Sequence, residues 1–243
     1  MEQIFQQEIV ISPSLCDVSG RLSIPDAFAI CMDIAAAHAD ALGCGLYDLA
    51  RRGLFWVTVK THLQFFERPR MMERVMLRTW PEAPGKLRGN RSYQLLRGDT
   101  VLLAGKTEWA VMHLQKMQPD LLSSVYPDAL RFETPSASPA PFARIADDFD
   151  GCAPLAYYTV RSTDIDVGGH MNNTAYIRAI LSCFSNREID EMRIGAMDVI
   201  FRSPCFEGDT LTLQKKDLEN ETDLRLSKDS GVTALLARIE RAP

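Results

Sequence analysis

A short segment in the second half of the chain, from Asp166 to Asn173, combines residue types that acyl-transfer chemistry uses. Asp166 and His170 lie four residues apart, across Gly168 and Gly169, whose lack of a Cβ lets the backbone approach a ligand. A carboxylate in such a turn can act as a general base on water or as a nucleophile at an acyl carbonyl. The alternative is a capped turn whose polar side chains only bond to the backbone, and the residue types alone favour neither interpretation.

The same segment ends where a helix is predicted to begin. Asn172 and Asn173 can cap a helix, and helical periodicity continues to about Phe184. The first N–H groups of a helix have no partner inside the helix, and they carry a partial positive charge. We therefore expect this helix N-terminus to stabilise an oxyanion formed at a reacting carbonyl.

The segment has a counterpart in the first half of the chain. Asp17–Leu22 matches Asp166–Met171 at an offset of 149 residues, and Phe66-Glu67-Arg68-Pro69 matches Phe201-Arg202-Ser203-Pro204 at an offset of 135. The two copies differ in chemistry, because Arg21, Ser23 and Ile24 stand where the second copy has His170, Asn172 and Asn173. The sequence predicts one fold written twice, with the working site in the second copy.

Each half is predicted to contain one main helix and several antiparallel strands. The first helix begins at Ser23, with Pro25 in its first turn, and ends at Gly43. Alternating residues predict strands at 55–66, 75–80, 90–96 and 101–114, with a tight turn at 97–100, and then at 157–161, 196–201, 210–216, 222–227 and 232–239. This pattern indicates an α+β fold in which a curved antiparallel sheet wraps each helix.

Composition and motif spacing restrict the possible functions. Residues 136–151, rich in Pro, Ser, Ala and acidic residues, are predicted to link domains 1–135 and 152–243. The net charge of -5 argues against nucleic-acid binding, and the absence of a long apolar run or an N-terminal signal pattern predicts a cytoplasmic protein without a membrane segment. Six cysteines without CxxC spacing, and the lack of a phosphate loop or dinucleotide motif, predict no metal and no cofactor.

The pattern Arg161-x-x-Asp164-x-Asp166-x-x-Gly169-His170-Met171-Asn172-Asn173-x-x-Tyr176 resembles the signature of hot dog fold thioesterases. The doubled arrangement resembles the thioesterases of plants and bacteria that act on acyl chains carried by acyl carrier protein (ACP). Similarity to the first unit of that family lies in Leu54–Thr58, Arg68-Pro69, Thr79-Trp80-Pro81 and Thr107–Met112. The resemblance implies a tandem (double) hot dog fold and hydrolysis of fatty acyl thioesters, with ACP as the carrier.

The resemblance also implies roles for individual residues. Asp166 would polarise water or attack the thioester carbon, His170 would orient or share the proton, and Asn172 and Asn173 match the asparagine pair of the family. Two positions depart from the family pattern, which has an asparagine at Gly168 and a glutamate at Pro204. Two further candidates follow Pro204. Cys205 matches a cysteine once taken for the nucleophile in plant relatives, although a lone cysteine is more often structural, and Glu207 could reach inward in place of the missing glutamate.

Other expectations concern the substrate. In the family the acyl chain lies in the first unit. The candidates for shaping chain length are therefore residues that are otherwise expected to be plain core: Ala35, Ala36, Leu42, Trp56, Trp80 and Trp109. The stretch 68–97 holds eight Lys and Arg residues against two Glu, so it either docks the acidic carrier or is an ordinary solvated strand face, and the charges alone do not decide between the two. His38 is expected to be a packed histidine. Hydrolysis of acyl-CoA, a catalytically silent acyl-binding protein and a homodimer stay open as alternatives.

Overall fold

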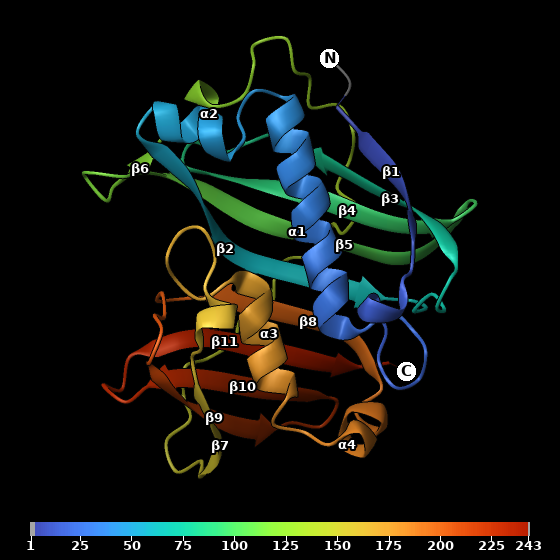
Figure 1. The fold of residues 1–243 in the computed structure, drawn as a ribbon, viewed down its shortest axis with the longest axis vertical. Helices are drawn as coiled ribbons and strands as arrows, with labels where there is room; N and C mark the ends of the chain where they lie inside the picture. The colour runs from blue at the N-terminus through green and yellow to red at the C-terminus, as the bar shows by residue number, and fades with distance from the viewer. Residues whose placement is uncertain (1–2, 243) are drawn as a thin grey trace. The chain divides into compact units, whose positions relative to one another are not determined.

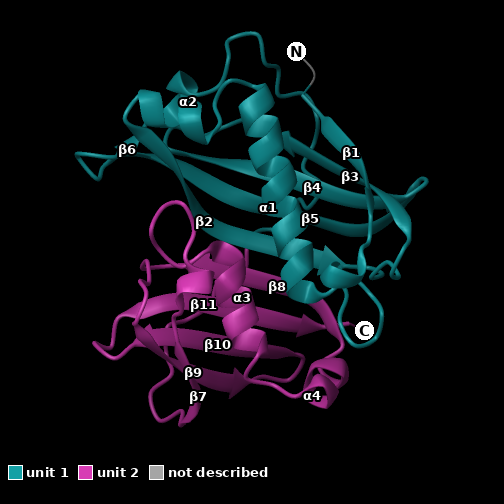
Figure 2. Ribbon diagram, viewed as in Figure 1, with its two compact units in different colours: residues 1–141 teal, residues 142–243 magenta. Residues whose placement is uncertain are grey.

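The computed structural model describes residues 3–242, and the chain divides into two compact units, residues 1–141 and 142–243 (Figures 1 and 2). Each unit contains a main helix beside an antiparallel sheet, as predicted. No helix among residues 3–242 is long and apolar enough to cross a membrane. The finer domain limits 1–135, 136–151 and 152–243 stay predictions.

Unit 1 contains five main strands that pair in the order β1-β3-β4-β5-β2, all antiparallel. The short strand β6 pairs with β5. Its strands are β1 (Phe5–Val10), β2 (Leu54–Phe65), β3 (Arg74–Pro81), β4 (Arg88–Arg97), β5 (Thr100–His113) and β6 (Pro119–Asp120). Its helices are α1 (Ile24–Ala41) and α2 (Leu46–Arg51), with 3-10 turns at Pro13–Leu15 and Leu122–Ser124. The strands β1 and β6 and the helix α2 were not predicted.

The helix α1 begins and ends where the sequence places its signals. The Ser23 side chain caps it by accepting the Asp26 N–H at 3.1 Å, and Pro25 occupies the first turn, where a missing N–H breaks no helical hydrogen bond. Gly43 ends it with a positive φ of 70°. The buried face of α1 is formed by Ile24, Ala27, Phe28, Ile30, Cys31, Ile34, Ala35, His38 and Ala39.

Unit 2 repeats the arrangement with the strand order β8-β11-β10-β9-β7, all antiparallel. Its strands are β7 (Pro154–Thr159), β8 (Ile194–Phe201), β9 (Thr210–Asp217), β10 (Glu221–Lys228) and β11 (Thr233–Arg241). Its helices are α3 (Asn173–Leu181) and α4 (Asn186–Glu191), with a 3-10 turn at Ser162–Asp164. The helix α3 ends three residues earlier than predicted, and α4 was not predicted.

Candidate active site

A closed turn carries Asp166 and His170 between the 3-10 turn at Ser162–Asp164 and helix α3. The Asp166 N–H donates to the His170 carbonyl at 3.0 Å, and the Gly169 N–H donates to the Asp166 carbonyl at 3.0 Å. Gly169 adopts a φ of 76°, which residues with a Cβ rarely adopt. Paired backbones at Ile165 and Met171 hold the two ends together. The fold therefore fixes the two side chains at the tip of one turn.

The carboxylate and the imidazole face each other without a direct hydrogen bond. His170 Nδ1 lies 3.8 Å from Asp166 Oδ1, which is beyond hydrogen-bond distance, while the Gly168 N–H donates to the same oxygen at 2.7 Å. The two side chains are partly exposed, at 28% for Asp166 and 41% for His170. A Cβ at position 168 would lie 3.0 Å from both Asp166 Oδ1 and His170 Nε2. Glycine at 168 thus keeps the space between the two groups open.

The start of α3 is already partly engaged by its own cap. The Asn172 side chain accepts the Thr174 N–H at 2.8 Å, and the Asn172 carbonyl accepts the Ala175 N–H at 2.9 Å. Asn173 is the first residue of the helix and is half-buried. Asn172 therefore has a positioning role, because it fixes the helix beside the turn and occupies one of the N–H donors that were expected to face an oxyanion.

The turn in unit 1 has the same backbone hydrogen bonds. Asp17 N–H donates to the Arg21 carbonyl at 2.9 Å, Gly20 N–H donates to the Asp17 carbonyl at 3.0 Å, and Ser19 N–H donates to Asp17 Oδ1 at 2.9 Å. Each of these bonds matches one in the second turn at the offset of 149 residues. The two turns are therefore one structure, and their difference lies in the side chains around the carboxylate.

In unit 1 the carboxylate is paired with an arginine. Arg68 Nη1 donates to Asp17 Oδ2 and, at 3.1 Å, to the Leu22 carbonyl, and the Ser19 hydroxyl donates to Asp17 Oδ1 at 2.5 Å. Burial acts to raise the pKa of Asp17, but the hydrogen bonds from Ser19 and Arg68 outweigh it and hold this pKa below its ordinary value. Asp17 is a neutralised carboxylate, which is poorly suited to accept a proton.

Backbone hydrogen bonds show which residues of the two copies correspond downstream of the helices, and they differ from the predicted correspondence. The Leu22 N–H donates to the Pro69 carbonyl, and the equivalent Met171 N–H donates to the Cys205 carbonyl at 2.7 Å, so Pro69 corresponds to Cys205. The predicted pairing of Pro69 with Pro204 is therefore wrong by one residue. Pro204 occupies the position of Arg68, and the second turn lacks the arginine that neutralises the first.

The two candidates beyond Pro204 occupy different surroundings. Cys205 is fully buried, and burial raises the pKa of its thiol, which disfavours the thiolate. Its N–H donates to the Tyr176 hydroxyl at 2.9 Å, which ties this segment to α3. Glu207 is exposed. Neither placement supplies a reason to assign a chemical step to these residues.

The predicted basic docking stretch 68–97 is largely neutralised within unit 1. Four of its eight cations contact carboxylates: Arg68 with Asp17, Arg74 with Glu8, Arg88 with Glu108, and Arg97 with Glu67 and Glu73. A fifth, Arg91, is buried. The stretch is therefore not a uniform positive surface, because carboxylates pair with half of its cations.

The residues expected to shape the acyl chain occupy mixed positions in unit 1. Ala35, Leu42 and Trp80 are buried, Trp56 and Trp109 are half-buried, and Ala36 is exposed. Ala36 therefore does not belong to the interior.

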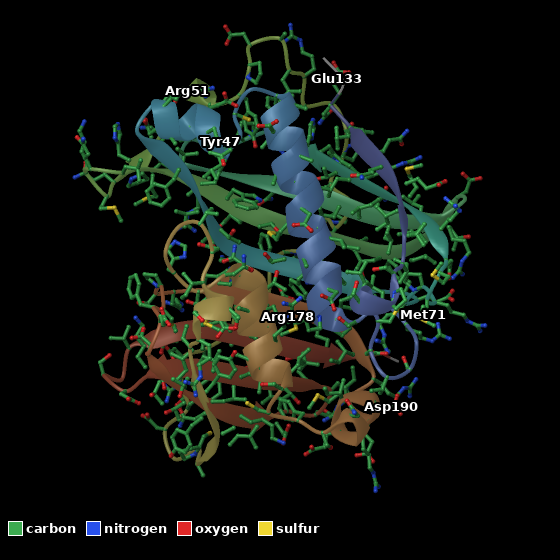
Figure 3. All side chains as sticks on the ribbon, viewed as in Figure 1. Tyr47, Arg51, Met71, Glu133, Arg178 and Asp190 are labelled. Atoms are coloured by element: carbon green, nitrogen blue, oxygen red, sulfur yellow. The ribbon has the colours of Figure 1, made fainter. Side chains whose placement is uncertain are left out.

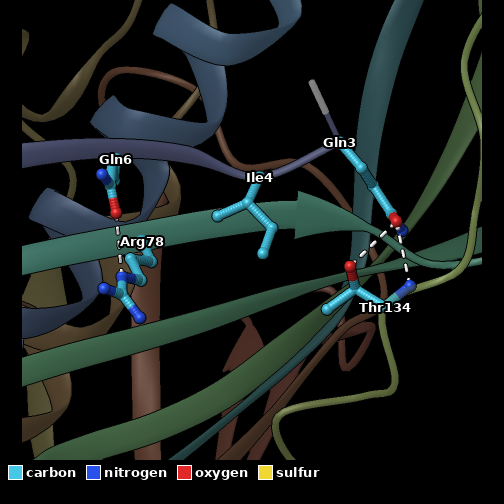
Figure 4. A pocket seen from close by; sticks show the side chains of 5 residues that line it. All are labelled: Gln3, Ile4, Gln6, Arg78 and Thr134. Carbon is cyan, nitrogen blue, oxygen red and sulfur yellow. Dashed lines mark hydrogen bonds between the residues drawn. The ribbon is translucent and has the colours of Figure 1, made fainter. Parts of the chain in front are cut away.

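A hollow at the edge of unit 1 offers no chemistry of its own. It is lined by Gln3, Ile4, Gln6, Arg78 and Thr134 (Figure 4). Gln3 Oε1 accepts the Thr134 N–H at 2.9 Å, and Arg78 Nε donates to Gln6 Oε1 at 3.0 Å. Its polar groups thus bond to one another. Among residues 3–242, no cluster of His, Cys, Asp and Glu has a geometry that could hold a metal ion.

Comparison with known protein families shows which family this chain belongs to. The N-terminal domain model of acyl-ACP thioesterases matches residues 2–128, and the C-terminal domain model of the same family matches residues 153–240. The chain belongs to the acyl-ACP thioesterase family. This membership places it among the thioester hydrolases of fatty acid metabolism.

The plant relatives are longer than this chain. Oleoyl-acyl carrier protein thioesterase 2 of Arabidopsis thaliana is 20% identical over 250 residues, which cover 94% of this chain and 67% of the plant protein. Oleoyl-acyl carrier protein thioesterase 1 of the same plant is 22% identical, over 74% of this chain and 54% of the relative. The chain thus spans about half to two thirds of these relatives.

Solved structures confirm the double hot dog fold. An acyl-ACP thioesterase from Bacteroides thetaiotaomicron superposes with a TM-score of 0.83 at 23% identity, covering 98% of this chain and 97% of that one. The 12:0-ACP thioesterase from Umbellularia californica superposes with a TM-score of 0.81 at 17% identity, covering 99% of this chain and 97% of that one. At these identities the likeness establishes the fold.

Proposed function

We propose that this protein hydrolyses fatty acyl thioesters of ACP, with Asp166 as the general base. The observation that carries this proposal is the contrast between the two turns. Both have the same backbone, but Asp17 is paired with Arg68, whereas Asp166 faces the imidazole of His170 and has Pro204 at the arginine position. A carboxylate without a bound cation is the better proton acceptor.

The proposed step is attack of water on the thioester carbon. Asp166 accepts one proton of the water as its oxygen bonds to the carbon, and the carbonyl oxygen gains negative charge. The C–S bond then breaks, the carrier leaves as the thiolate, and the thiolate takes a proton that Asp166 and His170 hold between them. The products are the free fatty acid and the carrier thiol. The same carboxylate acting as nucleophile is the alternative, and transfer of labelled oxygen from water into Asp166 would identify it.

The start of α3 contributes electrostatically to this step. Its dipole places partial positive charge beside the turn, which favours a developing oxyanion. Asn172 holds the helix in register through its bond to the Thr174 N–H. We assign Asn172 and Asn173 positioning roles, and we assign Asp166 and His170 the proton transfer.

Unit 1 has a binding role in this proposal. Its turn carries the neutralised Asp17, and its interior contains a half-buried aromatic group of Trp56, Trp109, Tyr126 and Phe132 against an apolar cluster. Apolar interiors with aromatic linings suit an acyl chain. We therefore place the acyl chain in unit 1.

A comparison of carriers tests the substrate assignment. The same acyl chain is presented as its ACP thioester and as its CoA thioester, and release of thiol is measured across several chain lengths. We expect a higher kcat/KM for the ACP thioester. A higher value for CoA would instead identify an acyl-CoA thioesterase, and turnover of neither thioester would favour the acyl-binding alternative.

A further inference from the structure

The indole N–H of Trp109 has no hydrogen-bond partner, whereas the indole N–H groups of the other two tryptophans each have one. Trp56 Nε1 donates to the Cys44 carbonyl at 2.9 Å, and Trp80 Nε1 donates to the Pro135 carbonyl at 3.0 Å. Trp109 Nε1 is buried without any partner. Buried indole nitrogens usually find an acceptor, so this donor is an exception that requires an explanation.

A second unpartnered group lies close to the first. Tyr93 is fully buried, and its hydroxyl has no hydrogen-bond partner, although Thr107 and Trp109 lie near it. Burial raises the pKa of Tyr93, so the phenol is neutral and keeps its proton to donate. The phenol oxygen could accept the indole N–H of Trp109, but neither atom has a partner with hydrogen-bond geometry, so both donors are left unpaired at one place.

A buried cation lies beside these donors. Arg91 is 4% exposed, and its Nη1 contacts His38 Nδ1 at 2.9 Å and Thr79 Oγ1 at 3.4 Å. Since the guanidinium can only donate, Nδ1 of His38 is the acceptor and that imidazole is neutral. Within residues 3–242, Arg91 forms no ion pair with a carboxylate. A buried charge with neutral partners is unfavourable unless another group compensates it.

The strand register places these groups on one face of the sheet. Arg91 on β4 pairs with Thr107 on β5, and Trp109 lies two residues further along β5 on the same face. Tyr93 lies two residues beyond Arg91. The contact between Arg91 and His38 shows that this face is the one covered by α1, the helix that lies across the sheet in Figure 1. The donors therefore lie in the interior between α1 and the sheet.

We infer that Tyr93, Trp109 and Arg91 form a binding site for an oxygen atom carried on the acyl chain of the substrate. This inference rests on the proposed function, because the chain that enters the interior of unit 1 is taken to be a fatty acyl group. The Tyr93 hydroxyl and the Trp109 indole each offer a free donor, and the guanidinium of Arg91 adds positive charge, so an acceptor is the ligand that suits them. A hydroxyl, a keto oxygen or a terminal carboxylate on the chain can accept from them, whereas a plain hydrocarbon chain leaves the hydroxyl of Tyr93 and the indole N–H of Trp109 unpaired.

Matched fatty acids test the site independently of turnover. The probes are one saturated acid and its counterparts of equal length with a hydroxyl near the carboxyl end, a hydroxyl at the far end, or a second carboxyl at the far end. The shift in Tm that each produces is measured for wild type, for Tyr93→Phe and for Tyr47→Phe. Tyr47 is 73% exposed on α2 and serves as the control (Figure 3).

We expect wild type to bind one oxygenated probe more tightly than the saturated acid. Tyr93→Phe should lower that preference about threefold to tenfold, the range of one hydrogen bond, while Tyr47→Phe leaves it unchanged. Loss of an unpartnered hydroxyl should not lower the Tm of the free protein, which shows that the variant folds. The inference is overturned if wild type prefers no oxygenated probe, or if Tyr93→Phe keeps the preference.

The corresponding thioesters separate this inference from the proposed function. If wild type hydrolyses no thioester but binds an oxygenated acid through Tyr93, the proposed hydrolysis fails and the binding site stands. If wild type hydrolyses plain and oxygenated thioesters with equal kcat/KM, and Tyr93→Phe changes neither value, the hydrolase stands and the oxygen site is wrong.

Discussion

The charge at position 204 should control the activity of Asp166. In unit 1 the residue at this position is Arg68, which contacts Asp17, and in unit 2 it is Pro204. The side chains of Asp17 and Asp166 are nearly equally exposed, at 29% and 28%, so an arginine should act on both in a similar way. Pro204→Arg should therefore give Asp166 an arginine partner like the one that Asp17 has in unit 1.

The expected magnitude follows from the effect of an ion pair on a base. An arginine beside a carboxylate lowers its pKa by about 1–3 units, and general-base catalysis contributes about 10²–10⁴ in rate. The guanidinium of Pro204→Arg would also cover the carboxylate. Partial exposure of Asp166 reduces the pairing through screening. We expect kcat/KM for an acyl-ACP thioester to fall by roughly tenfold to a hundredfold, a part of the general-base contribution.

Two matched variants separate charge from shape. Pro204→Gln removes the proline and introduces a neutral polar side chain. Pro204→Glu introduces a negative charge, which offers no cation to pair with Asp166 and should maintain turnover. Thiol release is measured at low and high salt, and the deficit of Pro204→Arg relative to Pro204→Gln should shrink as salt rises. Equal kcat/KM for the Arg, Gln and Glu variants would show that the charge at position 204 does not act on Asp166.

Other substitutions test the same account. Gly168→Ser should lower turnover about tenfold relative to Gly168→Ala, because a serine here would bond to Asp166 as Ser19 does to Asp17 and engage the base. Cys205→Ala should keep turnover in the thiol-release assay while lowering the free energy of unfolding by about 1 kcal/mol, since this residue is buried packing. Arg68→Ala should destabilise the protein at neutral pH in urea unfolding. The pKa of Asp17 is lowered in the folded state, so its pairing with Arg68 stabilises the protein above the unfolded pKa of about 3.9. This stabilisation is lost as pH falls through the folded pKa. The difference in stability between Arg68→Ala and wild type should therefore shrink in acid.

The long elements were predictable because their signals are local. Ser23, Pro25 and Gly43 mark the ends of α1, and alternating residues mark strands such as β5. The turn at Asp166 could be predicted for the same reason, because its polar residues and glycines occur in one short segment. The helices α2 and α4 were missed because six residues give too few turns for a periodic pattern.

Features that depend on distant partners could not be predicted. Arg68 and Asp17 are 51 residues apart in the chain, so their pairing, and the neutralisation of the basic stretch 68–97, arises only in the fold. The one-residue shift that places Pro204 opposite Arg68 was hidden because both copies contain a Phe-x-x-Pro phrase, whereas strand register depends on backbone hydrogen bonds. The missing partner of Trp109 likewise has no signal in the sequence.

The most direct test of the central claim is a single-turnover measurement on Asp166→Asn. The amide has nearly the same size and can still accept the Gly168 N–H, but it cannot take a proton from water. The account predicts that the acyl-ACP thioester binds as it does to wild type and that thiol release slows by about 10²–10⁴. Release at the wild-type rate would contradict the role given to Asp166.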